Sequence, residues 1–198
     1  MDNWDAAYSG KSESERSWTQ RIPSDSLGII DSISLDPGSA VIDIGGGASY
    51  LVDELVNRGF TDVTLLDISP DALEESRDRN GDRISYAVAN VTTWRPARTF
   101  AMWHDRAVFH FLTTEEEQAG YTRAVLEGTT AGSHLIIATF APDGPETCSG
   151  LPVCRWSADE LDAHFAGNFE SVSNARHIHT TPWGAAQPFT FVHLVRTR

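Results

Sequence analysis

The stretch Ala40-Val41-Ile42-Asp43-Ile44-Gly45-Gly46-Gly47-Ala48-Ser49 decides the fold of this chain. Its first half, residues 40–44, is short, apolar and mostly β-branched, which is typical of a strand buried on both faces. Three glycines follow, and residues 50–59 then show the apolar spacing of a helix. Glycine suits this junction because a backbone without Cβ can turn tightly and let a ligand approach closely. Strand, glycine turn and helix together predict the first unit of a sheet that binds a dinucleotide or a nucleoside.

A second predicted strand, residues 63–67, ends in a carboxylate. Asp67 lies about twenty residues beyond the glycine turn, where such folds hydrogen-bond the ribose hydroxyls of the ligand. Asp43, inside the first strand, argues against a nicotinamide ligand, because a nicotinamide site needs no carboxylate there. A nicotinamide or flavin domain is one alternative, and a glycine turn that only joins a strand to a helix is another.

The pattern Asp43-x-Gly45-x-Gly47, followed by Leu65-Leu66-Asp67-Ile68-Ser69, resembles motifs I and II of class I S-adenosyl-L-methionine (SAM) methyltransferases. This resemblance implies an α/β fold, a Rossmann-like doubly wound seven-strand mixed sheet of order 3-2-1-4-5-7-6 with helices on both faces. It also implies SAM as the cofactor. The sequence Asp-Arg-Ala-Val-Phe-His-Phe-Leu at residues 105–112 resembles the corresponding segment of small-molecule methyltransferases related to the thiopurine and tellurite enzymes.

The resemblance also implies which residues bind the cofactor. The acidic residue of the first strand is expected to help position the amino-acid end of SAM, and the glycine loop to pass under the cofactor. After a third predicted strand, residues 84–88, an asparagine stands where the family usually has an acidic residue near the adenine. The expected cofactor-binding residues are Asp43, Gly45, Gly46, Gly47, Asp67, Ile68, Asn90 and Val91.

Chemically active side chains gather around the fourth predicted strand, in residues 100–112. In a doubly wound sheet the carboxyl end of this strand opens onto the ligand crevice. Methyl transfer is an in-line displacement, and an acceptor other than a soft thiol or selenol needs a group that removes its proton. We predict His110 as that group, with His104 and Asp105 as alternatives. A structural histidine packed between Phe109 and Phe111 is the competing interpretation of His110.

Substrate contacts are expected from the N-terminal extension and from late loops. In the resembled family, an extension such as residues 1–34 folds over the cofactor as a helical lid. The Gly- and Pro-rich loop 141–153 follows the fifth predicted strand, residues 134–140, and loops of this length tend to be functional. The predicted substrate-binding residues are Trp18, Arg106, Cys148, His179 and Gln187.

Metal binding is not predicted. His177-x-His179 places two imidazole rings on one face of a strand, but no third ligand follows at a recognisable spacing. The two cysteines also lack the Cys-x-x-Cys spacing of a zinc site.

The composition limits the remaining possibilities. With 198 residues, 40% hydrophobic and 22% charged, the chain is expected to form one domain whose Rossmann-like core is residues 40–198. No apolar run approaches the roughly twenty residues of a membrane span, and with only two cysteines a cytoplasmic protein with free thiols is expected. The net charge of -13 argues against nucleic acid as a partner and favours a small neutral or cationic substrate.

The sequence therefore predicts an enzyme, a SAM-dependent methyltransferase of the EC 2.1.1 type. Its substrate is expected to be a small molecule with a sulfur, selenium, tellurium, oxygen or nitrogen nucleophile, its product S-adenosylhomocysteine (SAH), and its assembly a monomer or homodimer. Two alternatives stay open. One is a protein lysine or N-methyltransferase, although the Asn/Asp-Pro-Pro-aromatic signature of amine methylation is absent after the fourth strand. The other is a SAM-binding regulatory protein without catalysis.

Overall fold

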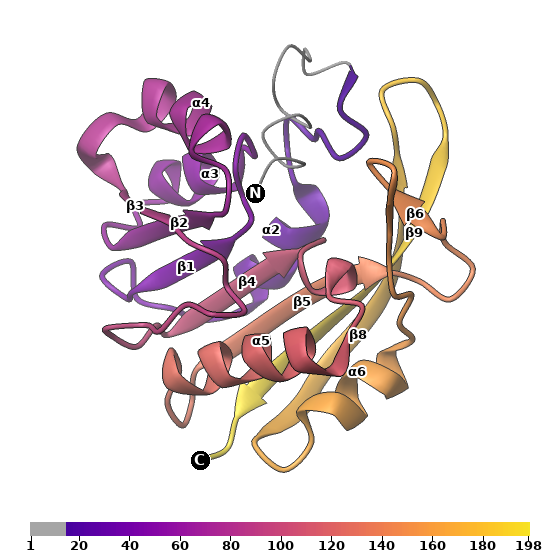
Figure 1. Cartoon of the computed structure of the whole chain (residues 1–198). Helices are drawn as coiled ribbons and strands as arrows, with labels where there is room; N and C mark the ends of the chain where they lie inside the picture. Colours follow the sequence, from indigo (N-terminus) through magenta and orange to yellow (C-terminus); the bar gives the residue numbers. More distant parts are fainter. Residues whose placement is uncertain (1–14) are drawn as a thin grey trace.

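The computed structural model describes residues 15–198, and its centre is a seven-stranded sheet of order β3-β2-β1-β4-β5-β9-β8 (Figure 1). The parallel strands are β1 (Val41–Ile44), β2 (Val63–Asp67), β3 (Ser85–Val88), β4 (Met102–Arg106) and β5 (His134–Phe140). The antiparallel strands are β9 (Ala186–Arg196), which pairs with β5, and β8 (Phe169–Thr180), which pairs with β9. Since β8 and β9 are the sixth and seventh strands of this sheet along the chain, the topology confirms the predicted mixed α/β sheet and its strand order.

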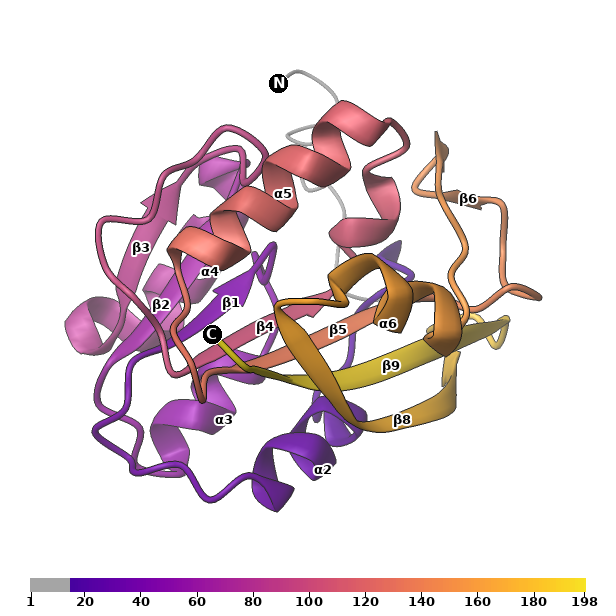
Figure 2. The same cartoon turned by 90° about the horizontal axis from the view of Figure 1, so that it is seen from below.

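Helices cover both faces of the sheet (Figure 2). On one face lie α5 (Glu115–Glu127) and α6 (Ala158–Phe165), and on the other α2 (Ser24–Ser32), α3 (Leu51–Asn57) and α4 (Pro70–Asn80). None of the helices in residues 15–198 is long and apolar enough to cross a membrane.

The central strands are rich in apolar residues because they are buried from both sides. In β1, Val41 packs with the side chains of α2 and α3, while Ile42 and Ile44 pack with those of α5 and α6. Successive side chains of a strand point to opposite faces, so one short run of apolar residues supplies both layers of the core.

Three helices begin at capping residues that are recognisable in the sequence. Ser69 accepts a hydrogen bond from the backbone of Ala72 and is followed by proline as the first residue of α4. Thr114 caps α5 and Ser157 caps α6, each in a reciprocal capping box with the glutamate three residues later.

Two segments differ from the prediction. The loop after β5 contains a small hairpin of β6 (Thr147–Cys148) and β7 (Leu151–Pro152). The last two strands were predicted as residues 169–179 and 189–196, and both are longer in the structure, which shortens the connection between them. Strands of two residues are too short to show a periodic pattern, so the sequence gives no sign of them. Of the predicted N-terminal extension, residues 1–14 lie outside the described residues.

Candidate active site

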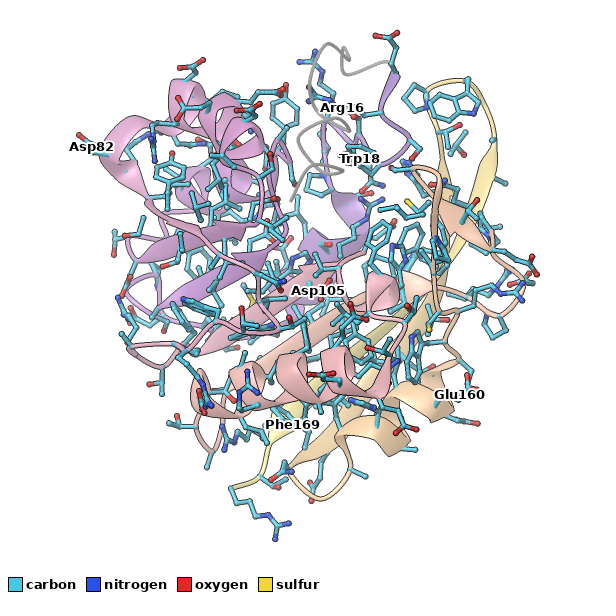
Figure 3. All side chains as sticks on the ribbon, in the orientation of Figure 1. Arg16, Trp18, Asp82, Asp105, Glu160 and Phe169 are labelled. Atoms are coloured by element: carbon cyan, nitrogen blue, oxygen red, sulfur yellow. The ribbon has the colours of Figure 1, made fainter. Side chains whose placement is uncertain are left out.

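A cavity of about 370 Å³ lies at the carboxyl ends of β1, β2 and β4, the edge where doubly wound sheets bind ligands. We divide its lining into two halves by the part of the sheet that each lies next to. The glycine-turn half includes Gly45, Gly46, Tyr50, Asp67, Ile68, Asn90, Val91 and Glu117. The β4 half includes Trp18, Gln20, Ser26, His104, Arg106, Val108, Phe111, Cys148, Ser149, Leu151 and Pro152. Figure 3 shows Trp18 on the segment that precedes α2, above the end of β4.

Two glycines of the turn are required by their surroundings. Gly45 has a φ of 64°, and a Cβ there would collide with the side chain of Val108. A Cβ on Gly46 would collide with the carboxylate of Asp43 and with Leu65. The backbone therefore runs directly over Asp43 and leaves room for a ligand on its other side.

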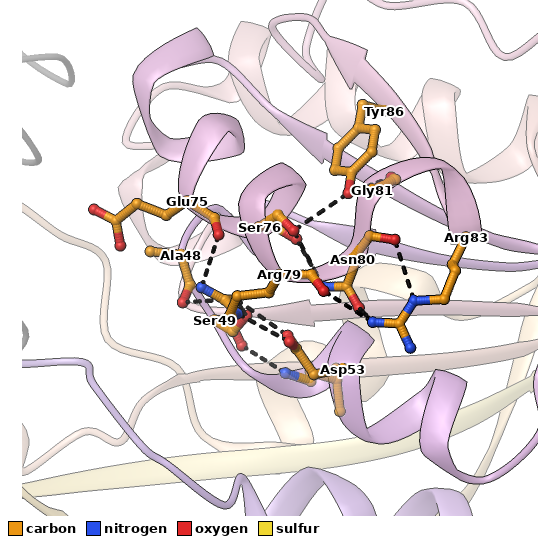
Figure 4. A network of polar contacts seen from close by, with 11 residues as sticks. Ala48, Ser49, Asp53, Glu75, Ser76, Arg79, Asn80, Gly81, Arg83 and Tyr86 are labelled. Carbon is orange, nitrogen blue, oxygen red and sulfur yellow. Dashed lines mark hydrogen bonds and ion pairs between the residues drawn. The ribbon is translucent and has the colours of Figure 1, made fainter.

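Arg79 of α4 holds the end of the glycine turn (Figure 4). Its Nη2 donates to the carbonyl oxygens of Ser49 at 2.7 Å and Ala48 at 3.3 Å. Its Nε pairs with Asp53 of α3 at 2.9 Å, and its guanidinium lies 4.4 Å from the ring centroid of Tyr50. The turn is thus fixed between two helices, a role that the sequence did not predict for Arg79.

Asp67 lies at the end of β2, and its buried carboxylate lines the glycine-turn half. Oδ1 accepts a hydrogen bond from the backbone N–H of Ser69 at 2.9 Å. Burial raises the pKa of Asp67 to about 6, while backbone N–H groups of Ser69, Ile68 and Gly47 act in the opposite direction. A buried carboxylate beside a cavity suits two ribose hydroxyls, which would supply hydrogen bonds to its remaining lone pairs.

Asn90 and Val91 lie in the same half, on the loop after β3. The side-chain oxygen of Asn90 accepts hydrogen bonds from the backbone N–H of Thr92 at 3.0 Å and from its hydroxyl at 2.8 Å. This side chain therefore stabilises its own turn. The loop is seated closely on α5, because a Cβ on Gly120 would collide with the carbonyl oxygen of Thr92.

Asp43, His104 and Ser26 form a buried chain of hydrogen bonds where the two halves meet. The sheet register sets Asp43 of β1 beside His104 of β4, and α2 brings Ser26 to the same face. Nδ1 of His104 lies 2.7 Å from Oδ1 of Asp43, and Nε2 lies 2.8 Å from Oγ of Ser26. Because a carboxylate can only accept, Nδ1 carries the proton and Nε2 accepts the hydroxyl proton of Ser26. All three residues line the cavity.

Arg106, the last residue of β4, brings a positive charge into the β4 half. Its Nη1 donates to the carbonyl oxygen of Trp18 at 3.1 Å, and its guanidinium lies 5.0 Å from the ring centroid of Phe189. Nε and Nη2 are buried, and neither has a hydrogen-bond partner in the described part of the chain. Burial lowers the pKa of Arg106 to about 10, which leaves the guanidinium charged at neutral pH.

His110, the predicted general base, does not line the cavity. It lies in the short 3-10 helix η3 (Phe109–Phe111), fully buried, with its ring 4.7 Å from that of Phe140 and 4.4 Å from that of Phe111. Burial lowers the pKa of His110 to about 3, so the ring is neutral. The structure therefore places His110 in the aromatic core, which was its alternative role, and we correct its assignment accordingly.

Asp105, an alternative to His110, is also absent from the cavity lining. Because side chains alternate along a strand, it points to the opposite face from His104. Its carboxylate accepts hydrogen bonds from the backbone of Val108 at 2.8 Å and of Phe109 at 3.0 Å, and from the hydroxyl of Tyr121. Burial raises the pKa of Asp105 to about 6. Its position gives it a structural role, fixing the turn after β4, and His104 is the predicted acid–base residue that the cavity contains.

The predicted substrate-binding residues divide in the same way. Trp18, Arg106 and Cys148 line the β4 half, and burial raises the pKa of the Cys148 thiol, which keeps it protonated. His179 and Gln187 pair with each other across β8 and β9 and do not line the cavity. The ring of His179 is instead held by a 2.5 Å contact with the carbonyl oxygen of residue 17.

The described residues contain no group of three or more His, Cys, Asp or Glu side chains arranged to hold a metal. The remaining member of the His-x-His pair, His177, lies 3.2 Å from the carboxylate of Asp25.

Three residues of the cavity lining, Ser26, Tyr50 and Glu117, were not among the predicted site residues. Ser26 is one hydroxyl within an amphipathic helix, and only the packing of α2 beneath β4 brings it to His104. Tyr50 follows the glycine turn directly and could have been selected on that ground alone. Glu117 belongs to a run of three glutamates at the start of α5, and it both caps this helix and lines the cavity.

Comparison with known proteins assigns a domain to this region. Residues 41–127 match the family model described as "Methyltransferase domain". A curated relative, the eEF1A lysine and N-terminal methyltransferase of Mus musculus, is 30% identical over 88 residues. That match covers 42% of this chain and only 13% of the relative's length.

Solved structures share the fold at low identity. The structure reported under "Conversion of a Disulfide Bond into a Thioacetal Group during Echinomycin Biosynthesis" superposes with a TM-score of 0.74 and 22% identity, covering 99% of this chain and 92% of the other. A SAM-dependent methyltransferase from Anabaena variabilis gives 0.73 and 15%, covering 98% and 94%. The glycopeptide N-methyltransferase MtfA with bound SAM gives 0.67 and 12%, covering 91% and 96%. At these identities the likeness shows the fold.

Proposed function

We propose that this chain, a SAM-dependent methyltransferase by its fold and by the domain over residues 41–127, methylates a sulfur, selenium, tellurium, oxygen or nitrogen atom of a small molecule. The observation that carries the proposal is one cavity with two unlike halves. The glycine-turn half offers a carboxylate and open backbone to a nucleoside, and the β4 half offers acid–base groups and apolar walls to a second molecule. SAH would be the second product.

The glycine-turn half fits SAM on two observations. Gly45 and Gly46 line the cavity with bare backbone, because a Cβ at either position would collide with the protein, and the buried carboxylate of Asp67 also lines the cavity. Asp67 would bind the ribose hydroxyls, while Ile68 and Val91 would enclose the adenine ring. When bound, SAM supplies an electrophilic methyl group on a sulfonium.

The β4 half supplies alignment and a proton route. Holding a nucleophile in line with the methyl carbon can contribute on the order of 7–11 kcal/mol. A hydroxyl or amine bound against Ser26 would give its proton to Oγ of Ser26 while the hydroxyl proton of Ser26 passes to Nε2 of His104. The imidazolium formed in this way would be stabilised by Asp43, 2.7 Å from Nδ1.

A small acceptor is favoured over a protein side chain because two segments outside the sheet form part of the wall of the β4 half. The segment before α2 and the β6–β7 hairpin both contribute to its wall. The lysine and N-terminal methylation of the Mus musculus relative is the reason to keep a protein substrate as the second candidate. The thiopurine and tellurite branch, a cytoplasmic location and a monomer or homodimer stay predictions.

Calorimetric titration with SAM, SAH and NAD tests the cofactor assignment. We expect micromolar binding of SAM and SAH and no binding of NAD. A panel of thiol, selenol, phenol and amine acceptors, assayed by release of SAH, then tests transfer. NAD binding without SAM binding would contradict the proposal, and SAM binding without transfer to any acceptor would favour the regulatory alternative.

The proton route has its own test in Ser26→Ala. We expect kcat to fall about a hundredfold for a hydroxyl or amine acceptor, since general base catalysis contributes roughly 10²–10⁴-fold. The loss should be smaller for a thiol, and the Kd of SAH should stay within about twofold. Ser32→Ala is the matched control, because this serine lies in the same helix and hydrogen-bonds only to the exposed carbonyl oxygen of Ile29. An unchanged kcat in Ser26→Ala with every acceptor would remove Ser26 from the mechanism.

A further inference from the structure

We propose that the methyl acceptor is an apolar or aromatic carboxylic acid whose carboxylate binds the guanidinium of Arg106. This inference rests on the proposed function and deepens it by naming the chemical class of the second substrate. It is built on the unpartnered donors of Arg106, on the place of this residue in the cavity lining and on the character of the surrounding wall.

The first step concerns the hydrogen bonds that Arg106 lacks. Of its donors, Nη1 is bonded to the carbonyl oxygen of Trp18, while Nε and Nη2 are buried without a partner in the described part of the chain. Buried charges in folded proteins are normally paired and hydrogen-bonded, because an unpaired one is strongly destabilising. A guanidinium left in this state is explained when its partner arrives with a ligand.

The second step is the geometry of the two unpartnered atoms. Nε and Nη2 carry parallel N–H bonds on one edge of the planar guanidinium, and a carboxylate binds such an edge through both of its oxygens. The other donors are occupied or stacked, since Nη1 faces residue 18 and the plane lies over the ring of Phe189. The side chain is thereby held with its carboxylate-binding edge unsatisfied.

The third step assigns this edge to the acceptor and not to SAM, which also contains a carboxylate. Arg106 lies two residues beyond His104 on the same face of β4, about 6.6 Å farther along the strand toward the carboxyl edge of the sheet. The rings of His110 and Phe189 and the thiol of Cys148, all near Arg106, come from the second half of the chain, while the carboxylate that acts on it most strongly, Asp25, belongs to α2. Asp43, expected beside the amino-acid end of SAM, is on the neighbouring strand next to His104.

The fourth step is the character of the remaining wall. Apart from Arg106, this part of the cavity is lined largely by apolar side chains, namely Trp18, Val108, Phe111, Leu151 and Pro152. Such a wall suits a hydrocarbon or an aromatic ring attached to the acid. The nearby acidic groups Asp25 and Asp43 act on Arg106 only through space, because neither hydrogen-bonds to it.

This inference reverses the expectation of a neutral or cationic substrate that the net charge suggested. The net charge of -13 is a property of the whole surface, and its field is screened within about 10 Å at 0.1 M salt. An acid bound to Arg106 would touch its desolvated guanidinium, and at contact distance this attraction outweighs the repulsion from Asp43, Asp67 and Glu117, which line other parts of the cavity. Local charge therefore decides the class of acceptor.

The experiment compares acids with their primary amides, which have nearly the same shape and no charge. Benzoate, phenylacetate, 3-phenylpropionate and indole-3-acetate, each paired with its amide, are titrated calorimetrically into the protein with and without saturating SAH. We expect at least one acid to bind ten times more tightly than its amide. Arg106→Gln should abolish this preference, while its Kd for SAH stays within about twofold of the wild-type value. Arg98→Gln is the control, because Arg98 is an exposed arginine paired with Asp62 before the start of β4.

The outcomes separate the two proposals. Equal binding of every acid and its amide, or no binding of any acid, would overturn the carboxylate site while SAH binding leaves the methyltransferase proposal standing. If Arg106→Gln weakened the binding of SAH by the same factor as the binding of the acids, the arginine would be assigned to the cofactor. That result would also overturn the carboxylate site. If the wild-type protein fails to bind SAH, the proposed function fails, and the titrations without SAH still decide whether an acid prefers Arg106. If Arg106→Gln does not fold, the preference for each acid over its amide is compared between the wild-type protein and Arg106→Lys. Lysine keeps the charge but lacks the planar edge of the guanidinium.

Discussion

The burial of the Asp67 carboxylate places it in the lining of the cavity, and it also lowers the free energy of unfolding when the carboxylate is charged. The pKa of Asp67 is raised from 3.8 to about 6, so between these values the native state holds a proton that the unfolded chain has released. By linkage, the stability of the ligand-free protein falls as pH rises from about 4 to 6 and stays lower above that range. Ribose binding needs the charged form, so the affinity for SAM and SAH should change with pH in the opposite direction.

Asp67→Asn tests both effects. We expect the Kd of SAH at pH 7.5 to rise by about 10- to 100-fold, because hydrogen bonds to a charged group contribute roughly 1.5–3 kcal/mol each. In the wild type, SAH binding should weaken as pH falls through 6, while in the variant it should not. Thermal unfolding between pH 4 and 7 should show a smaller loss of stability with rising pH in Asp67→Asn. A variant whose SAH affinity keeps the wild-type pH dependence would contradict the assignment. Asp105, whose pKa is also raised to about 6, remains in both proteins and cancels in the comparison.

Single residues also show which features of the site could be predicted from the sequence. The acid–base candidates His104, Asp105 and His110 were all identifiable from their place after a buried strand, and the alternation of a strand separates the first two. Which face holds the cavity depends on residues 16–26, whose contacts with β4 span about eighty positions of the chain. The turn that buries His110 among aromatic rings has no pattern of its own. The residue types of the site were therefore predictable, and their directions were not.

Among the elements, α5 matters for the candidate site because the loop after β3, which carries Asn90 and Val91, rests on it. Its Gly120 leaves no space for a Cβ, which would collide with the backbone oxygen of Thr92 on that loop. In α2, Gly28 has no neighbouring atom within 4 Å of where a Cβ would stand. Two helix glycines thus have opposite surroundings, although propensity alone would favour alanine at both by about 1 kcal/mol.

The pair Gly120→Ala and Gly28→Ala provides the test at this scale. We expect Gly28→Ala to raise the free energy of unfolding by about 0.5–1 kcal/mol and to leave SAH binding unchanged. Gly120→Ala should lower it by about 1–3 kcal/mol, as overpacking does, and weaken SAH binding by displacing Asn90 and Val91. Urea unfolding and calorimetry measure both quantities. A stabilised Gly120→Ala with normal SAH affinity would show that the loop is not seated on α5 as the structure has it.

The elements themselves followed from local chemistry wherever they were long or capped. The strands β1, β2 and β5 showed themselves as β-branched apolar runs, and Ser69, Thr114 and Ser157 marked helix starts that the structure reproduces. The β6–β7 hairpin was missed because two-residue strands depend on the turn at Ser149 and Gly150, both with positive φ. That hairpin brings Cys148 and Leu151 into the lining of the β4 half of the cavity. An element that was not predicted therefore shapes the half of the cavity whose residues were harder to predict.

Over the whole molecule, the distribution of charge acts differently on the two ligands. The surface is acidic overall, with a net charge of -13, while Arg106 stands buried in the cavity. SAM carries one more positive charge than SAH, because its sulfur is a sulfonium. The long-range field should therefore attract SAM, leave SAH unaffected and repel an anionic acceptor until it reaches Arg106.

Ionic strength separates these effects. Between 10 mM and 0.5 M salt, we expect the association rate of SAM to fall by up to about tenfold, the low end of electrostatic steering because one net charge is involved. The association rate of SAH should change little, so the preference for SAM over its product is greatest at low salt. For an acid that binds Arg106 the association rate should rise with salt, since screening removes the repulsion at long range, while its dissociation rate stays nearly constant because a buried ion pair is screened less. Stopped-flow fluorescence, with the primary amide of the same acid as the neutral control, measures these rates. Identical salt dependence for SAM and SAH would mean that the surface charge does not reach the cavity entrance, and the class of acceptor would then rest on Arg106 alone.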